Sequence, residues 1–270
     1  MNQPEPATNS PILTEHLDTQ GILTLTLNRP EQFNALSEAM LLALQHALDT
    51  IDPATRVVVI AATGKAFCAG HDLREMRAHV DEPAGGEQWQ RHLFNQCSRF
   101  MQTLLALPQP VICKVQGVAA AAGCQLVANC DLAIAAEHCR FAVSGINLGL
   151  FCSTPSVALS RNLQRKRAFQ MLMTGEFIDA RTAVDWGLLN QCVPAESLDD
   201  AVELLCRKIC AKSRVAVATG KSLFYRQLEL PMAEAYSAAS DAMACNMMAQ
   251  DVSEGIDAFF DKRPPQWTHR

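Results

Sequence analysis

The sequence predicts an α/β protein with a helical C-terminal region, and three observations support that fold class. Short apolar runs typical of buried strands alternate with segments of helical periodicity as far as residue 197. Two of these runs, Val57–Ala62 and Val111–Val115, each lead into a block of small residues and then a helical segment. From Leu198 onward only helical patterns occur. Strands that alternate with helices indicate βαβ units and a mostly parallel sheet.

The first third of the chain contains clear strand and helix signals. Ile22–Leu27 alternates apolar and polar residues, as a half-buried strand does. Ser37 is a suitable N-cap for a helix that extends to about Asp49, because its hydroxyl can accept a bond from an unpaired N–H of the first turn. Residues 79–88 favour a mobile loop, and a helix is expected from about residue 88 to residue 105.

The rest of the chain continues this alternation and then becomes helical. A helix is expected to end at about Asn129, followed by a short strand at residues 132–135. In the C-terminal region Pro231 is expected to begin one helix, and Gly255 is expected to interrupt another. The predicted organisation is a disordered lead-in (residues 1–11), an acyl-CoA-binding core (12–197) and a helical oligomerisation region (198–270).

Composition excludes several classes of protein. The 270 residues carry a formal net charge of −5, which argues against nonspecific nucleic-acid binding. Eleven cysteines without a C-x-x-C pair indicate a reduced protein rather than a disulfide framework or a metal site. The first ten residues lack the features of a targeting peptide, and polar residues interrupt the apolar stretch 115–136. We therefore expect a cytoplasmic protein that does not bind membranes.

Two blocks of small residues mark strand-to-helix turns. The first, residues 64–73, follows the strand at 57–62, and the second, residues 114–125, begins where the strand at 111–115 ends. Small side chains let a ligand approach the backbone closely. A chain that enters a helix also presents unpaired N–H groups to such a ligand. Two turns that each offer one N–H to the same oxygen would form an oxyanion hole.

With these blocks and several shorter motifs, the chain resembles the crotonase (enoyl-CoA hydratase/isomerase) superfamily over roughly residues 12–268. The matching motifs occupy residues 28–30, 34–36, 66–73, 117–125, 173–175, 186–188 and 254–263. The resemblance implies a spiral of ββα units, with C-terminal helices that assemble homotrimers or hexamers. It implies a coenzyme A thioester as substrate and no permanently bound cofactor or metal.

The resemblance also assigns the oxyanion hole. The backbone N–H groups of His71 and Ala122 occupy the positions that bind the thioester carbonyl in the family. The imidazole of His71 is a candidate general base, since histidine ordinarily titrates near pH 6.5. The family varies the side chain at this position, however, which favours a role for the ring as pocket wall.

The two catalytic acids of the family's hydratases are absent. The first glutamate position is occupied by Gln125, whose neutral amide can orient a water molecule but cannot exchange a proton near neutral pH. The second position is Gly145, which has no side chain. Ordinary hydration needs both proton transfers, so these replacements argue against it. One branch of the family shares this loss and a similar pattern at residues 149–155.

Further residues are candidates for contact with substrate. An unusual run follows the second acid position, and its members Ser144, Asn147, Cys152 and Ser153 are expected near the acyl group, together with Gly145. The resemblance places the nucleotide end of coenzyme A near the first turn and near residues 34–35, with help from basic side chains. These candidates are Arg29, Asn34, Ala35, Ala69, His71, Asp72, Leu73, Arg74, Lys262 and Arg263.

Three functions remain open at this point. The first is an acyl-CoA enzyme that stabilises a thioester-derived anion, with decarboxylation or thioester hydrolysis as reactions that need no glutamate pair. The second is a catalytically weak acyl-CoA-binding or regulatory protein. The third is an RNA-binding protein, which the acidic composition disfavours. The sequence contains no G-x-G-x-x-G after a strand and no G-x-S-x-G, which disfavours a dinucleotide-binding fold and an ordinary α/β-hydrolase.

Overall fold

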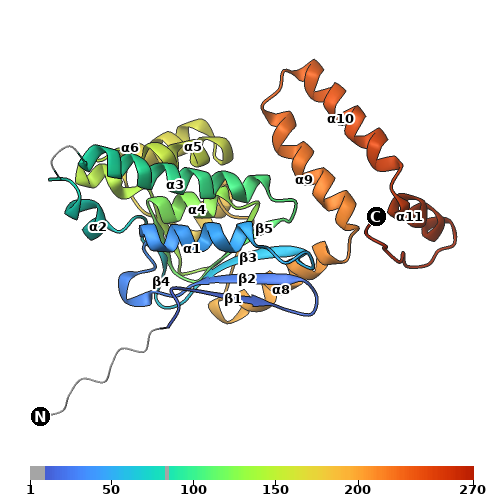
Figure 1. The fold of residues 1–270 in the computed structure, drawn as a ribbon, viewed down its shortest axis with the longest axis horizontal. Coiled ribbons are helices and arrows are strands. Elements are labelled where there is room, and N and C mark those ends of the chain that lie inside the picture. Colours follow the sequence, from blue (N-terminus) through green and yellow to red (C-terminus); the bar gives the residue numbers. More distant parts are fainter. Residues whose placement is uncertain (1–9, 83–84) are drawn as a thin grey trace, which may run out of the picture.

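The computed structural model describes residues 10–82 and 85–270 (Figure 1). Most of the lead-in predicted for residues 1–11 therefore lies outside the described residues, as do residues 83–84 of the predicted loop.

Two sheets form the core. The larger has the order β1 (Leu13–Leu17), β2 (Ile22–Leu27), β3 (Val57–Ala62), β5 (Val111–Val115), β7 (Leu132–Ala136) and β10 (Gln191–Val193). The smaller has the order β4 (Ala66–Cys68), β6 (Val118–Ala120), β8 (Arg140–Ala142) and β9 (Ile178–Asp179).

From β3 to β8, successive strands alternate between the two sheets. β3, β5 and β7 pair in parallel in the larger sheet, whereas β4, β6 and β8 pair in parallel in the smaller one. Each pair of strands is followed by helix, so the chain winds as a spiral of ββα units. The fold class predicted from the sequence is confirmed. The helices are α1 (Glu38–Asp49), α2 (Leu73–Ala78), α3 (Gly86–Ala106), α4 (Ala122–Asn129), α5 (Ser153–Asn162), α6 (Arg165–Thr174), α7 (Ala180–Trp186), α8 (Leu198–Cys210), α9 (Arg214–Leu228), α10 (Met232–Met247) and α11 (Gln250–Phe260).

The parallel strands are buried because helices cover both faces of the larger sheet. Figure 1 shows α1, α3 and α4 on one side of it and α8 on the other. All but the last residue of β3 are buried, and β5 is buried except at Lys114. Such continuous apolar runs are expected where a parallel sheet has no solvent-facing side. The predicted N-cap of α1 is also present, since Ser37 Oγ accepts a bond from the N–H of Met40 at 3.2 Å.

Two details of the predicted organisation differ in the structure. α3 begins at Gly86, so the loop before it is shorter than expected. α11 runs without interruption through Gly255, and the prediction of a break there was wrong. A Cβ atom at Gly255 would lie 3.2 Å from the ring of Trp267. The glycine therefore makes room for the indole rather than ending the helix.

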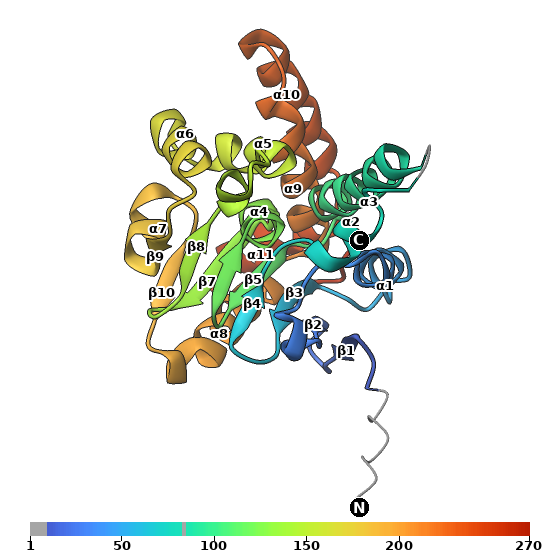
Figure 2. The ribbon, with the colours of Figure 1, turned by 90° about the vertical axis from the view of Figure 1, so that its left-hand side faces the viewer.

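The C-terminal helices divide into two groups. α8 buries Leu198, Val202 and Cys206 and packs against β3, β5 and β7, although it lies beyond the predicted boundary at residue 197. α9 and α10 form an antiparallel hairpin that extends beyond α3 and α5 (Figure 2). Because α8 packs against the larger sheet, the separate C-terminal part of the chain begins at α9 rather than at residue 198. The division into core and oligomerisation region stays a prediction.

A buried ionic cluster fixes the base of this hairpin to the core. Lys221 on α9 donates from Nζ to Asp131 Oδ2 at 2.7 Å and to the carbonyl oxygens of Leu104 at 2.7 Å and Gln109 at 2.9 Å. Tyr225 donates its hydroxyl to the other carboxylate oxygen of Asp131 at 2.6 Å. These three side chains, Asp131, Lys221 and Tyr225, are called the α9 anchor below. They set where α9 leaves the core.

Candidate functional site

The two strand-to-helix turns predicted to form the oxyanion hole lie against each other. Gly70 follows β4 and has a φ of +100°, which favours glycine. A Cβ atom at Gly70 would lie 2.9 Å from Ala121 Cβ and 3.2 Å from the backbone nitrogen of Ala122. Glycine at this position thus permits the close approach of the first turn to the beginning of α4.

Both predicted donor groups are free. Ala122 is the first residue of α4, and Ala121 before it has a φ of +48° and a ψ of −118°. The first N–H groups of a helix have no partner within it. Within the described residues, the backbone N–H groups of His71 and Ala122 donate no hydrogen bond. Two unpaired N–H groups at adjoining turns are what an oxyanion would need.

A cavity of about 210 Å³ lies next to these turns. It brings together the predicted residues Ala69, His71, Leu73, Ala122, Ser144, Gly145, Cys152 and Ser153. Its other wall residues are Met76, Phe94, Ala121, Leu148, Leu150, Phe151, Thr154 and Pro155. Most of these side chains are apolar. This composition suits a small acyl group held by its carbonyl.

His71 lines the cavity, and two contacts hold its ring in place. Nδ1 lies 3.2 Å from the carbonyl oxygen of Leu36. Nε2 is inaccessible to solvent and has no partner among the described residues. The ring meets Phe94 edge-on, with the centroids 5.5 Å apart. Burial lowers the pKa of His71 below 6.5, and the contact with the Leu36 carbonyl only partly opposes this effect.

The residues after His71 begin α2. Asp72 is the N-cap, and its Oδ1 accepts bonds from the N–H of Arg74 at 2.9 Å and of Glu75 at 3.3 Å. Its carboxylate is therefore used to start the helix. Leu73 lines the cavity with a largely exposed side chain, whereas the exposed Arg74 does not line it.

At Gly145 the structure has no room for the acid of the family's hydratases. A Cβ atom there would lie 2.7 Å from Cys152 Sγ and 2.7 Å from the carbonyl oxygen of Leu150. Real Cβ atoms do not approach neighbours this closely. The sulfur of Cys152 occupies the space into which a side chain at residue 145 would extend.

Cys152 is a buried thiol at the N-cap of α5. Burial raises its pKa, and a hydrogen bond from the Gly145 backbone opposes that rise. A thiol with a raised pKa stays protonated at neutral pH and is a weak nucleophile. Its closeness to Gly145 has no signal in the sequence, because six residues separate the two and a 3₁₀ helix (Ser144–Leu148) brings them together.

Gln125 lies on α4 and is 4% exposed. It is not among the residues that line the cavity. Its Oε1 is buried and has no hydrogen-bond partner within the described parts of the chain. The amide is thus held next to the site without a bonding role in the folded protein.

The predicted contacts for the nucleotide end of coenzyme A are more scattered. Asn34 is fully buried and accepts a bond from the N–H of Arg29 at 2.8 Å. Its Nδ2 donates to the carbonyl oxygens of Thr63 at 2.8 Å and Ala66 at 2.9 Å. The side chain therefore holds the loop before α1 in place. Ala35 is half-buried in the same loop.

Lys262 and Arg263 do not approach the cavity within one chain. They follow α11, which Figure 1 shows at the opposite end of the molecule from α2 and α5. Arg263 makes a bidentate pair with Glu254, at 2.7 and 2.9 Å. Asn147 is exposed and does not line the cavity.

Sequence reasoning missed the aromatic wall of the cavity. Phe94 and Met76 come from α3 and α2, and helical periodicity alone does not say which neighbour each face meets. Leu148, Leu150 and Phe151 belong to the unusual run already singled out, but their own role was not predicted. The signal for them in the sequence was a group of large apolar residues in a segment without helical or strand periodicity.

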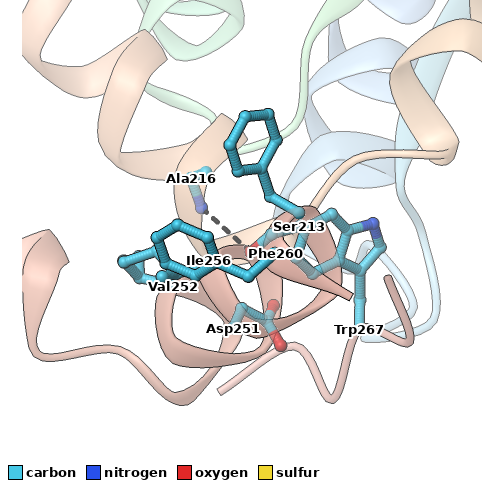
Figure 3. A pocket seen from close by; sticks show the side chains of 9 residues that line it. Ser213, Ala216, Asp251, Val252, Ile256, Phe260 and Trp267 are labelled. Carbon is cyan, nitrogen blue, oxygen red and sulfur yellow. Dashed lines mark hydrogen bonds between the residues drawn. The ribbon is translucent and has the colours of Figure 1, made fainter. Parts of the chain in front are cut away.

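A second, larger cavity of about 500 Å³ lies in the C-terminal region (Figure 3). Val252, Ile256 and Phe260 of α11 and the indole of Trp267 form most of its lining, and Ser213 and Ala216 close it from the α9 side. Asp251 at its edge is paired with the N–H groups of Thr268 at 2.7 Å and His269 at 2.9 Å. The lining is apolar and contains none of the predicted site residues.

Within residues 10–82 and 85–270, no three His, Cys, Asp or Glu side chains are grouped as ligands of a metal ion. In the same part of the chain, no helix is both long enough and apolar enough to span a bilayer.

Comparison with known proteins adds to this geometry. The family model described as enoyl-CoA hydratase/isomerase matches residues 18–270. Enoyl-CoA hydratase domain-containing protein 3, mitochondrial, from Xenopus laevis is 44% identical over 95% of this chain and 86% of its own length. A crystal structure of an enoyl-CoA hydratase from Mycobacterium smegmatis is 56% identical, with a TM-score of 0.91 over 95% of this chain and 99% of its own.

A crystal structure of human enoyl-CoA hydratase domain-containing protein 3 also matches. It is 41% identical, with a TM-score of 0.89 over 95% of this chain and 100% of its own. The resemblance stated from the sequence motifs is confirmed by these matches. The matches also confirm the branch that the missing acids indicated, which is represented by enoyl-CoA hydratase domain-containing protein 3.

Proposed function

Because the chain belongs to the enoyl-CoA hydratase/isomerase family, we propose that it binds acyl-CoA thioesters and stabilises a thioester-derived oxyanion with the N–H groups of His71 and Ala122. The free N–H groups of the two adjoining turns carry this proposal. Fixed dipoles of this kind stabilise developing negative charge without reorganisation, and removal of one donor typically costs about 2.7–4 kcal/mol.

The proposed reaction is not ordinary hydration. Gln125 cannot exchange a proton near neutral pH, and Gly145 leaves no space for an acid because Cys152 occupies it. General acid–base catalysis is typically worth about 10²–10⁴-fold per participating group. We expect crotonyl-CoA hydration, followed by the absorbance of the enoyl thioester, to be slower than in family members with both acids by at least this factor. A rate equal to theirs would show that other side chains supply both proton transfers.

Binding through the carbonyl can be tested with a matched pair of ligands. Calorimetry with butyryl-CoA and with the thioether S-butyl-CoA compares molecules that differ in the carbonyl oxygen. A hydrogen bond contributes roughly 0.5–1.5 kcal/mol net, so two bonds predict about tenfold or more tighter binding of the thioester. Equal affinities would contradict the oxyanion assignment, and no binding of either ligand would contradict the acyl-CoA assignment.

A catalytically weak acyl-CoA-binding or regulatory protein is the second candidate. The unpaired Oε1 of Gln125 and the filled acid position favour it, because neither provides catalysis. Turnover on a panel of acyl-CoAs, including thioester hydrolysis and decarboxylation, separates the two candidates.

The assembly proposed for this chain is a homotrimer or hexamer without a permanently bound cofactor. Large apolar side chains on α10 support it: Met232, Tyr236 and Met243 are 74%, 71% and 72% exposed. A mass near 29.5 kDa by light scattering would refute it.

The proposed location is the cytoplasm, although the name of the relative from Xenopus laevis includes the word mitochondrial.

A further inference from the structure

Four large apolar side chains line the acyl cavity and are also open to solvent. Leu148, Leu150 and Phe151 come from the segment that leads into α5, and Leu73 is the first residue of α2. They are between 38% and 68% exposed, and they are called the apolar rim below. Exposed apolar side chains that are scattered singly need no explanation, but several around one cavity are typical of a ligand-binding groove.

The cavity wall offers no partner for a charge on the acyl group. Among the described residues that line it there is no lysine, arginine, aspartate or glutamate. Ser144, Ser153 and Thr154 are neutral, and burial lowers the pKa of His71 below 6.5, so its ring is uncharged at neutral pH. The exposed Arg74 does not line the cavity. A carboxylate that leaves water for such a site without a partner loses its solvation and gains nothing in return.

The cavity is also larger than a short acyl group. Its volume of about 210 Å³ equals that of about seven water molecules at roughly 30 Å³ each. A methylene group is close to a water molecule in size, and a butyryl group has three carbons beyond its carbonyl. With the thioester oxygen at the N–H groups of His71 and Ala122, which line the same cavity, a butyryl group leaves much of the space unfilled. A longer chain fills it and continues onto the apolar rim.

We propose that the cavity takes uncharged aliphatic acyl groups of about six to ten carbons, with the far end of the chain on the apolar rim. This inference rests on the proposed binding of acyl-CoA at the same cavity. It also distinguishes between the reactions left open above. A decarboxylase must bind an acyl group that carries a second carboxylate, for which the wall has no partner among the described residues. The expected substrates are thioesters of monocarboxylic rather than dicarboxylic acids.

Three coenzyme A thioesters test chain length and charge separately. Calorimetry with the full-length protein compares butyryl-CoA, octanoyl-CoA and suberoyl-CoA, whose eight-carbon acyl group ends in a carboxylate. A fully buried methylene group tightens binding about fourfold. The exposed rim covers only part of the longer chain, so the Kd of octanoyl-CoA should be at least about tenfold below that of butyryl-CoA. The Kd of suberoyl-CoA should be at least about tenfold above that of octanoyl-CoA.

Leu148→Lys tests the role of the apolar rim. Leu148 is largely exposed, so the substitution should leave the fold intact. A lysine at this position can pair with the far carboxylate of suberoyl-CoA and removes apolar surface from the path of the octanoyl chain. The preference for octanoyl-CoA over suberoyl-CoA should therefore fall by at least about tenfold. Leu42→Lys replaces another largely exposed leucine, on α1 and outside the cavity, and should leave the preference unchanged.

Several outcomes would overturn this inference and leave the proposed function intact. They are equal Kd values for butyryl-CoA and octanoyl-CoA, equal Kd values for octanoyl-CoA and suberoyl-CoA, or an unchanged preference in Leu148→Lys. The last result would mean that the rim is not in contact with the acyl chain and is left for another molecule, such as a second copy of the chain. No binding of any of the three thioesters to the wild type would overturn the proposed function itself.

Discussion

The α9 anchor and the acyl cavity both bury polar side chains, but they treat them in opposite ways. In the anchor, Lys221 makes three hydrogen bonds, and both carboxylate oxygens of Asp131 accept bonds from side chains. Near the cavity, Nε2 of the wall residue His71 and Oε1 of Gln125, which does not line the cavity, are buried without partners among the described residues.

The difference is between a fully paired polar cluster and unpaired polar atoms, and unpaired atoms also occur away from the cavity, for example at Thr55 and Gln96. A buried polar group without a partner costs free energy, and most such groups in folded proteins are paired. The anchor follows that rule and connects α9 to the core. The two unpaired atoms near the cavity depart from it, and neither is accessible from the cavity in the folded chain.

The largest effect is expected from the anchor. Lys221→Met leaves the Asp131 carboxylate without its charged partner in a largely buried setting. Removal of one member of a buried pair typically costs about 3–5 kcal/mol, and urea unfolding should show a loss of this size. Lys166→Met, at an exposed position on α6, should change stability little. A loss below about 1 kcal/mol in Lys221→Met would show that the α9 anchor does not stabilise the fold as proposed.

Tyr225→Phe tests the second arm of the anchor. Burial raises the pKa of Tyr225, so its hydroxyl stays protonated and donates to Asp131. A hydrogen bond to a charged group is worth about 1.5–3 kcal/mol, which is the loss expected from urea unfolding. Tyr236→Phe, on the exposed side of α10, removes the same hydroxyl and should be neutral.

Gly145→Ala tests whether the acid position is closed. The added methyl group would meet Cys152 Sγ and the Leu150 carbonyl, and overpacking typically costs about 1–3 kcal/mol. The cost should shrink in the double variant Gly145→Ala/Cys152→Ala, which a double-mutant cycle measures. Gly220→Ala in α9 meets no neighbour and should stabilise the protein by roughly 0.5–1 kcal/mol. Equal stability of Gly145→Ala and wild type would mean that the position is open.

The smallest effect on stability is expected at Gln125. Gln125→Met replaces a buried amide that has an unpaired oxygen with an apolar side chain of similar length, so the free energy of unfolding should change by less than about 0.5 kcal/mol. Asn129→Leu, on the same helix, is the matched control. Its Nδ2 donates to the carbonyl oxygen of Met101, and loss of that bond should cost about 1–3 kcal/mol. A large loss of stability in Gln125→Met would show that the Gln125 amide makes a stabilising interaction in the folded protein.

The parts of the fold that the sequence predicted are those governed by local patterns. β3 and β5 have the expected bounds because a strand buried on both faces reads as an unbroken apolar run. The start of α1 follows from the side-chain chemistry of Ser37. The break expected at Gly255 failed because a distant residue, Trp267, occupies the space beside the glycine.

The site shows the same division. The blocks of small residues predicted two adjoining turns, and the structure brings Gly70 against Ala121. Nothing local predicts that Phe94 covers the ring of His71, or that Cys152 fills the space beside Gly145, because both contacts depend on how separate segments pack. The missing acids were visible in the sequence, but the reason they cannot simply be restored was not.

The contact between Gly145 and Cys152 also affects which substitutions at residue 145 the fold tolerates. A single substitution to glutamate at residue 145 would place Cβ 2.7 Å from a sulfur atom and from a carbonyl oxygen, so the first step toward an acid here destabilises the fold. A smaller residue at Cys152 removes one of these two contacts. The stability effect of a carboxylate at residue 145 therefore depends on which residue is already present at 152.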